Sequence, residues 1–141
     1  MGKKTSDTKR NIMERIADYF SFFLEAIKEN MWVRNEEISF REISEKEGYI
    51  RGTLYLHGGY NLHVAEYVTI KQSKPIAIKY RYQLQTLDNR FTVRWDNAPH
   101  HKTIDSFPHH KHCRNGETVA SVINNIFDVL KSLDKELKNE I

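Results

Sequence analysis

The alternation of apolar and polar residues between residues 49 and 70 constrains the fold most. Successive side chains of a strand point to opposite faces of a sheet, so this period is typical of strands with one buried face. Two such strands are expected here, joined by a turn that contains Gly58 and Gly59. Their apolar positions are Ile50, Leu54, Leu56, Leu62, Val64, Val68 and Ile70.

The length of that turn decides whether both apolar sets face one core. A two-residue turn would pair Leu54 with His63, and a slip of one residue moves every side chain to the other face. We therefore predict an odd-length turn or a bulge. In the predicted register Leu54 faces Val64, and Glu66 faces Gly52.

A second hairpin has simpler geometry, because the Asp-Asn dipeptide at residues 88–89 is a favoured two-residue turn. This turn pairs Tyr82 with Trp95 on the core side. On the other face it places Arg81 opposite Asp96, where we expect a cross-strand ion pair.

Amphipathic helical segments precede and follow the strands. Each has apolar residues at three- and four-residue spacing, which is the pattern of a helix with one buried face. We expect the first to begin near residue 6 and the second near residue 115 or 118. The apolar stripes consist of Ile12, Ile16, Tyr19, Phe20, Phe23, Leu24, Ile27 and Met31 in the first segment, and of Val119, Val122, Ile123, Ile126, Phe127, Leu130, Leu133 and Leu137 in the second.

These elements predict an α+β fold, in which the N- and C-terminal helices pack on one face of an antiparallel sheet. We expect a meander of four to five strands, since the poorly patterned segment Glu36–Ser44 allows a short strand or an irregular crossing. The whole chain, residues 1–141, fits one domain, with a flexible basic tail at residues 1–5.

Composition argues against several classes of protein. The single cysteine, Cys113, cannot form an internal disulfide framework. No segment is apolar enough for a signal peptide or a membrane span, so we expect a cytoplasmic protein without a membrane partner. The net charge of +3 is a mild bias toward polyanions.

Glu66 is unusual because it lies on the apolar face, between Val64 and Val68. A buried carboxylate is costly unless it is paired, and burial raises its pKa. Two interpretations stay open. Glu66 is either a structural residue bonded to water or to a tyrosine hydroxyl such as that of Tyr80, or a catalytic or ligand carboxylate.

The opposite face of the predicted sheet gathers cationic and aromatic side chains. Bases stack on aromatic rings and phosphates bind guanidinium groups, so this face is a candidate platform for RNA. The alternative is an ordinary solvated face of an antiparallel sheet. The residues on it are Arg51, Tyr55, His57, His63, Tyr67, Lys79, Arg81, Gln83 and Arg94.

Five of the seven histidines fall within thirteen residues, after the last predicted strand. Imidazole exchanges protons near neutral pH and is the commonest metal ligand in proteins. Two prolines favour an extended loop here, in which alternate side chains point the same way. The five are His100, His101, His109, His110 and His112.

One interpretation of this loop needs no metal. Cleavage of RNA through its own 2′-hydroxyl requires a general base, a general acid and a cation beside the phosphate. Two of the histidines, together with Arg94 or Lys111, would supply these groups.

Other interpretations remain open. A hydrolase that uses zinc or another divalent metal would take His110, His112 and either His101 or His100 as ligands, with Cys113 or Asp96 as a candidate further ligand, although the spacing matches no zinc signature. A binding module without enzymatic activity would use the same loop to contact a nucleic acid or a protein. A structural loop would use Asn97 and the histidines as hydrogen-bond partners for the backbone.

Two runs in this region resemble the signature of the TumE-type family of small prokaryotic proteins. They are Arg94-Trp95-Asp96-Asn97-Ala98-Pro99-His100-His101 and Phe107-Pro108-His109-His110-Lys111-His112. The resemblance extends over about residues 51–137, and it implies the toxin half of a toxin–antitoxin pair with a small helix-turn-helix antitoxin as partner. It marks as motif positions Glu66, Asp96, Asn97, His100, His101, His109, His110 and His112.

The hypothesis is therefore a toxin whose target is RNA or the translation machinery, and which acts as a metal-independent, histidine-based ribonuclease without a cofactor. A homodimer and a zinc-dependent site at His101, His110 and His112 are the open alternatives. The candidate catalytic residues are Glu66, Arg94, Asp96, His100, His101, His110 and His112. The candidate binding residues are Arg51, Tyr55, Tyr67, Lys79, Arg81, Asn97 and Lys111.

Overall fold

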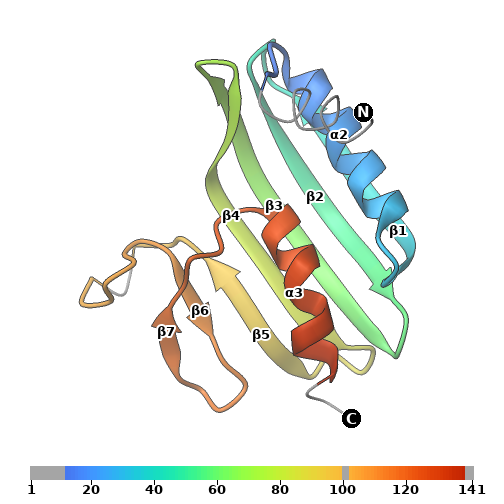
Figure 1. The fold of residues 1–141 in the computed structure, drawn as a ribbon, viewed down its shortest axis with the longest axis vertical. Helices are drawn as coiled ribbons and strands as arrows, with labels where there is room; N and C mark the ends of the chain where they lie inside the picture. Colours follow the sequence, from blue (N-terminus) through green and yellow to red (C-terminus); the bar gives the residue numbers. More distant parts are fainter. Residues whose placement is uncertain (1–11, 100–101, 139–141) are drawn as a thin grey trace, which may run out of the picture.

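A computed structural model describes residues 12–99 and 102–138 of the chain. Within them, the helices are α2 (Ile16–Glu29) and α3 (Ile126–Lys138), and the strands form one antiparallel sheet in sequence order. The strands are β1 (Val33–Glu42), β2 (Glu47–Leu56), β3 (Tyr60–Lys71), β4 (Lys74–Thr86), β5 (Phe91–Asp96), β6 (His110–His112) and β7 (Thr118–Ala120). Both helices lie across the same face of the sheet (Figure 1).

The α+β prediction is confirmed, but the expected sheet of four to five strands is wrong, because the sheet has seven. The poorly patterned segment 36–44 belongs mostly to β1, a full edge strand. Residues 110–120 contribute β6 and β7, and α3 begins only at Ile126. A strand of three residues has too few alternating positions to be recognised in a sequence. Val119 and Val122 are exposed, but their spacing resembles the apolar stripe of a helix, so the helix was expected to begin too early.

The N-terminal helix is described from Ile16 onward, while its expected start near residue 6 and the tail at residues 1–5 lie outside the described residues. Its predicted stripe is confirmed where it meets the sheet. Ile16, Tyr19, Phe23 and Ile27 are all buried, and Met31 is exposed beyond the helix end.

The turn between β2 and β3 has the predicted odd length, with residues 57–59 between the strands and both glycines at positive φ. The register is shifted by two residues from the prediction, so that Leu54 faces Leu62 and Glu66 faces Ile50. A shift of two keeps every side chain on its predicted face. The hairpin of β4 and β5 has the predicted register around Tyr82 and Trp95. The predicted two-residue turn is wrong, because residues 87–90 separate the strands and the register shifts between Leu84 and Gln85.

Gly52 does not face Glu66 as predicted, because it pairs with Val64 of β3. It lies opposite Ile38 of β1, and a Cβ atom there would come within 2.0 Å of the carbonyl oxygen of Glu37. The glycine therefore allows β1 to approach β2 closely.

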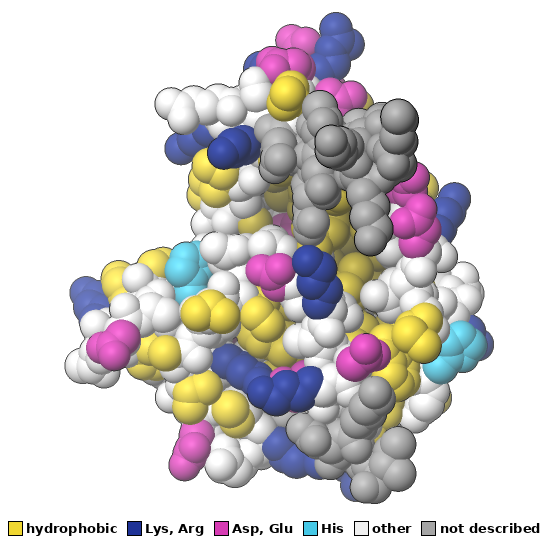
Figure 2. Space-filling model, in the orientation of Figure 1, with side chains coloured by type: hydrophobic (Ala, Val, Ile, Leu, Met, Phe, Trp, Pro, Cys, Tyr) yellow, Lys and Arg dark blue, Asp and Glu magenta, His cyan; other side chains and the backbone are white. Residues whose placement is uncertain are grey.

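The core lies between the helices and the sheet. Trp95, Tyr82 and Phe23 are its largest fully buried side chains, and Phe127 of α3 packs edge-on against Tyr19 and Phe23 of α2. Apolar side chains are visible along the furrow between the helices (Figure 2), where a hollow of about 230 Å³ is lined partly by Tyr19 and Phe127. Among the described residues, neither helix is long and apolar enough to cross a membrane.

Candidate active site on the outer sheet face

The register places the cationic residues and the histidines on one surface. Residues directly opposite one another in neighbouring strands share a face of the sheet. Cross-strand pairing runs from Arg51 through Ala65 and Arg81 to Asp96 and then His110. All of these side chains therefore lie on the face away from the helices, called here the outer face.

Two further rows flank this one on the outer face. One contains Thr53, His63, Gln83, Arg94, His112 and Thr118 in cross-strand order. The other contains Arg41, Tyr49, Tyr67 and Lys79. The candidate RNA platform and two of the loop histidines thus belong to a single continuous surface.

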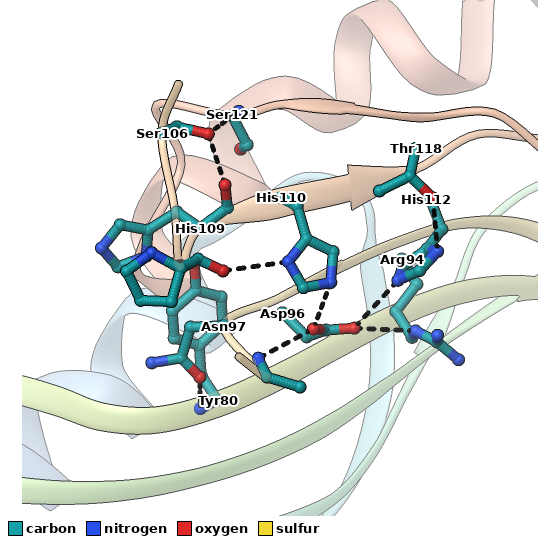
Figure 3. A network of polar contacts seen from close by, with 12 residues as sticks. Tyr80, Arg94, Asp96, Asn97, Ser106, His109, His110, His112, Thr118 and Ser121 are labelled. Atoms are coloured by element: carbon teal, nitrogen blue, oxygen red, sulfur yellow. Dashed lines mark hydrogen bonds and ion pairs between the residues drawn. The ribbon is translucent and has the colours of Figure 1, made fainter. Parts of the chain in front are cut away.

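The carboxylate of Asp96 is the centre of a polar cluster at the end of β5 (Figure 3). Its Oδ1 lies 2.6 Å from Nε2 of His110 and accepts a hydrogen bond from the backbone N–H of Ala98 at 3.1 Å. Its Oδ2 accepts from Nε of Arg94 at 3.0 Å and lies 3.4 Å from Nε2 of His112. Asp96 is only 6% exposed, so these contacts compensate the cost of burying the carboxylate.

Strand β6 positions both histidines of the cluster. His110 and His112 are two residues apart in a strand, so their rings point to the same side. The two rings pack edge to face, with their centroids 4.8 Å apart. His110 is 2% exposed, and its Nδ1 lies 2.9 Å from the carbonyl oxygen of Pro108. The side chains of His112 and Arg94 are 21% and 29% exposed, so these two are the members that a ligand can reach.

The expected ion pair between Arg81 and Asp96 is replaced by other contacts. The two residues are cross-strand neighbours as predicted, but the guanidinium of Arg81 donates to Gln83 while Asp96 bonds to Arg94. The carboxylate already has other partners, because Arg94 of the same strand contacts Oδ2 while His110 and the Ala98 N–H contact Oδ1.

Lys111 and His109 lie on the helix face, because they alternate with His110 and His112. Nζ of Lys111 is 2.6 Å from Oε1 of Glu136 on α3 and lies over the ring of Trp95. The ring of His109 stacks on Tyr80 and bonds to its hydroxyl at 2.8 Å. The side chains of both residues are therefore separated by the sheet from the Asp96 cluster.

Glu66 is also separated from the cluster, as a buried residue of the helix face. Its carboxylate accepts hydrogen bonds from the hydroxyls of Tyr19 on α2 and Tyr82 on β4, rather than from Tyr80 as suggested. Burial raises the pKa of Glu66 to about 7, although the two tyrosine hydroxyls lower it. Its contacts are those of the structural interpretation, because they fix α2 to the sheet.

Asn97 ends β5 with two hydrogen bonds to β4. Its Oδ1 accepts from the backbone N–H of Tyr80 at 3.0 Å, and its Nδ2 donates to the carbonyl oxygen of Ile78 at 2.9 Å. These are the contacts of a structural residue. His100 and His101 lie outside the described residues, so their predicted catalytic and metal-binding roles stay predictions.

A sequence model of the family described as "Toxin TumE" matches residues 23–141. The chain belongs to the TumE toxin family. The match contains every strand of the sheet and every residue of the Asp96 cluster, and it supports a toxin component. No curated protein and no solved structure matches the chain.

This TumE-family chain has a cationic hollow on its outer face, next to the cluster. The hollow is about 700 Å³ in volume, and its lining includes Arg41, Arg51, Arg81, Lys79 and the rings of Tyr49 and Tyr67. The two tyrosine rings lie 4.9 Å apart, and the hydroxyl of Tyr67 donates to Glu47 at 2.6 Å. Arg51, Ala65 and Arg81 also line a neighbouring hollow that reaches His63 and Gln83.

Sequence reasoning missed Tyr49 and Arg41, which line this hollow. Tyr49 could have been predicted, because the alternation from Ile50 places its side chain on the outer face. It is the exposed tyrosine of that surface. Arg41 could not have been predicted, because its position depends on the pairing of β1 with β2, and the alternation in β1 is poor. Tyr55 is on the predicted face but lies in the row beyond His63, farther from the hollow.

Proposed function

We propose that this protein is the toxin half of a toxin–antitoxin pair and that it cleaves RNA on the outer face. The observation that carries the proposal is the cross-strand row from Arg51 through Arg81 to Asp96 and His110. It joins a surface suited to nucleic acid with a cluster suited to proton transfer. Family membership supports the toxin role.

The binding step uses the cationic hollow. A single-stranded RNA has unstacked bases, which stack on exposed aromatic rings, and phosphates, which attract arginine and lysine. Tyr49 and Tyr67 offer the rings, while Arg51, Arg81 and Lys79 offer the charges. A strand bound there continues along the sheet toward Arg94 and His112.

The chemical step is transesterification without a metal. The 2′-oxygen attacks the adjacent phosphorus and the bond to the 5′-oxygen breaks, which leaves a 2′,3′-cyclic phosphate and a 5′-hydroxyl. His112 takes the proton of the 2′-hydroxyl, and Arg94 stabilises the charge on the phosphoryl oxygens. A second imidazole returns a proton to the 5′-oxygen, and His100 and His101 are the candidates for it.

The other members of the cluster position these two. Asp96 contacts both Arg94 and His112, so it fixes the guanidinium beside the imidazole. His110 is too buried to touch RNA and holds Asp96 from the opposite side. Asp96 and His110 are therefore proposed as positioning residues rather than catalytic ones.

The proposed partner is a small helix-turn-helix antitoxin, and the proposed place of action is the cytoplasm, where the RNA is. The toxin family supports an antitoxin as partner. An antitoxin that covers the cationic hollow would exclude RNA from both the binding and the chemical step.

The test is cleavage of an end-labelled single-stranded RNA by the purified full-length chain. We expect products that end in a 2′,3′-cyclic phosphate, and we expect loss of cleavage in His112→Ala and Arg94→Gln. His57→Ala is the matched control, because His57 is not on the RNA platform as predicted: it is exposed in the turn between β2 and β3, outside the lining of both outer-face hollows and away from the cluster. Intact RNA with the wild-type protein, or full activity of His112→Ala, would refute the proposal.

A further inference from the structure

His110 lies between two hydrogen-bond acceptors. The carbonyl oxygen of Pro108 can only accept, so Nδ1 of His110, 2.9 Å away, carries a hydrogen. Nε2 of the same ring lies 2.6 Å from Oδ1 of Asp96, and an ionised carboxylate can also only accept. Two lone pairs at this distance repel one another unless a cation lies between them, and that cation is either a proton or a metal ion.

The surroundings of both rings are those of metal-binding histidines. A ligating histidine typically donates its other ring N–H to a backbone carbonyl or another acceptor, which fixes the ring and the tautomer. His110 makes this bond to Pro108, and Nδ1 of His112 lies 3.3 Å from Oγ1 of Thr118. Both rings thereby turn Nε2 toward Asp96.

The three donor atoms are close enough to share one ion. Each of the three residues, Asp96, His110 and His112, offers one ligand atom, and these three atoms lie within 4.8 Å of one another. Tetrahedral zinc, with bonds of about 2.0 to 2.2 Å, separates its ligands by about 3.3 to 3.5 Å. The distances from the Asp96 oxygens to Nε2 of His110 and of His112 are 2.6 and 3.4 Å, which are close to that separation.

We infer that Asp96, His110 and His112 form a binding site for Zn²⁺ or a similar transition-metal ion, and that an ion bound there inhibits RNA cleavage. Two imidazoles and one carboxylate suit such ions, whereas Mg²⁺ and Ca²⁺ prefer oxygen ligands alone. The ion takes the Nε2 lone pair of His112 that proton transfer requires. This second half of the inference rests on the proposed function.

Burial of the site argues for inhibition rather than metal catalysis. Asp96 and His110 are both less than 10% exposed, so an ion that they hold together with His112 borders the outer face only at His112. A catalytic zinc instead presents an open position to water and substrate. The ion would cross-link β5 to β6 at the edge of the RNA surface.

Arg94 allows metal binding and RNA cleavage to be separated. Its guanidinium bonds to Oδ2 of Asp96 at 3.0 Å, and a positive charge at that distance opposes a cation on the same carboxylate. Removal of this charge should strengthen zinc binding. The same change should abolish cleavage, because Arg94 is the proposed phosphate ligand.

The first experiment measures Zn²⁺ binding to the metal-stripped full-length chain by equilibrium dialysis, with Co²⁺ absorption as a report of tetrahedral geometry. We expect one ion per chain, at least about tenfold weaker binding in His112→Ala and Asp96→Asn, and about threefold or greater strengthening in Arg94→Gln. His57→Ala and His63→Ala are the controls, because both histidines lie outside the cluster. Unchanged affinity in His112→Ala and Asp96→Asn, each shown to be folded by circular dichroism, would overturn the site.

The second experiment adds Zn²⁺ to the RNA cleavage assay. Inhibition with the same concentration dependence as binding, reversed by a chelator, would support the inference. Stimulation by zinc would overturn the inhibitory role. Zinc binding by a protein that cleaves no RNA under either condition would support the metal site but refute both the proposed function and the inhibition.

Discussion

Glu66 and Asp96 are two buried carboxylates on opposite faces of the same sheet, and they differ in their partners. Glu66, on the helix face, accepts hydrogen bonds from the neutral hydroxyls of Tyr19 and Tyr82. Asp96, on the outer face, contacts one guanidinium and two imidazoles, which carry or can carry positive charge. Similar burial thus serves two purposes: the first group joins a helix to the sheet, and the second assembles charged groups beside a binding surface.

Replacement of Asp96 should have the largest effect, which is a loss of folding stability. Asp96→Ala leaves Arg94, His110 and the Ala98 N–H without their acceptor, and removal of one partner from a buried ion pair costs about 3 to 5 kcal/mol. Urea unfolding measures this loss of stability. The exposed Asp88 is the control, since Asp88→Ala should leave the midpoint nearly unchanged; an equal effect of both changes would contradict the role of Asp96.

The pH dependence of stability should distinguish Glu66 from Asp96. The pKa of Glu66 is raised from 4.5 to about 7, so the folded state binds this proton more tightly than the unfolded state does. The protonated Glu66 therefore adds to the free energy of unfolding, and this contribution is complete below about pH 4.5. It is lost as the pH rises through about 7, which lowers the free energy of unfolding by up to about 3 kcal/mol.

Glu66→Gln has no proton to lose and is the matched variant for this effect. Urea midpoints measured between pH 4.5 and 7.5 should fall more steeply for the wild-type protein than for Glu66→Gln. Equal slopes for the two proteins would show that Glu66 is not the group responsible. Under the structural interpretation, Glu66→Gln should also keep its RNA cleavage.

The tyrosine partners of Glu66 should have a smaller effect on stability. Tyr82→Phe removes one donor to a buried carboxylate, and such a hydrogen bond contributes about 1 to 3 kcal/mol. Its control is Tyr67→Phe on the outer face, where the hydroxyl bonds to Glu47 and little change in the unfolding midpoint is expected. A larger shift for Tyr67→Phe would contradict the comparison of the two faces.

The smallest expected effect is on RNA affinity, in a comparison of two cationic residues on opposite faces of the sheet. Arg81→Gln should weaken RNA binding and reduce the slope of log affinity against log salt by about 0.7, the value for one lost contact with a single strand. Lys111→Gln should change neither, because its ammonium faces Glu136 on α3. Fluorescence anisotropy across a salt series measures both, and equal effects would place RNA elsewhere.

The accuracy of the sequence predictions followed the amount of local information. The hairpin of β4 and β5 was predicted in the correct register for Tyr82 and Trp95 but with too short a turn, because the irregularity between Leu84 and Gln85 offsets the longer connection. The hairpin of β2 and β3 was correct in its faces but shifted by two residues, since odd turns of different length preserve the same alternation. The three-residue strands β6 and β7 were missed, because they are held mainly by their neighbours.

The candidate site shows the same division. That His110 and His112 point the same way was predicted from their spacing, and the same alternation excludes Lys111, which was nevertheless proposed beside them. Their contact with Asp96 was only a possibility in the sequence. It depends on β6 pairing with β5, across a connection that alternation does not describe.

The sequence by itself determined which side chains share a face, because the alternation of a strand is a property of its covalent geometry. Only the tertiary structure decided which strands are neighbours and which rows align across them, because pairing depends on turn length and on packing against the helices. For this reason the glutamate of one face and the aspartate of the other look alike in the sequence. Their partners come from distant segments that the fold brings together.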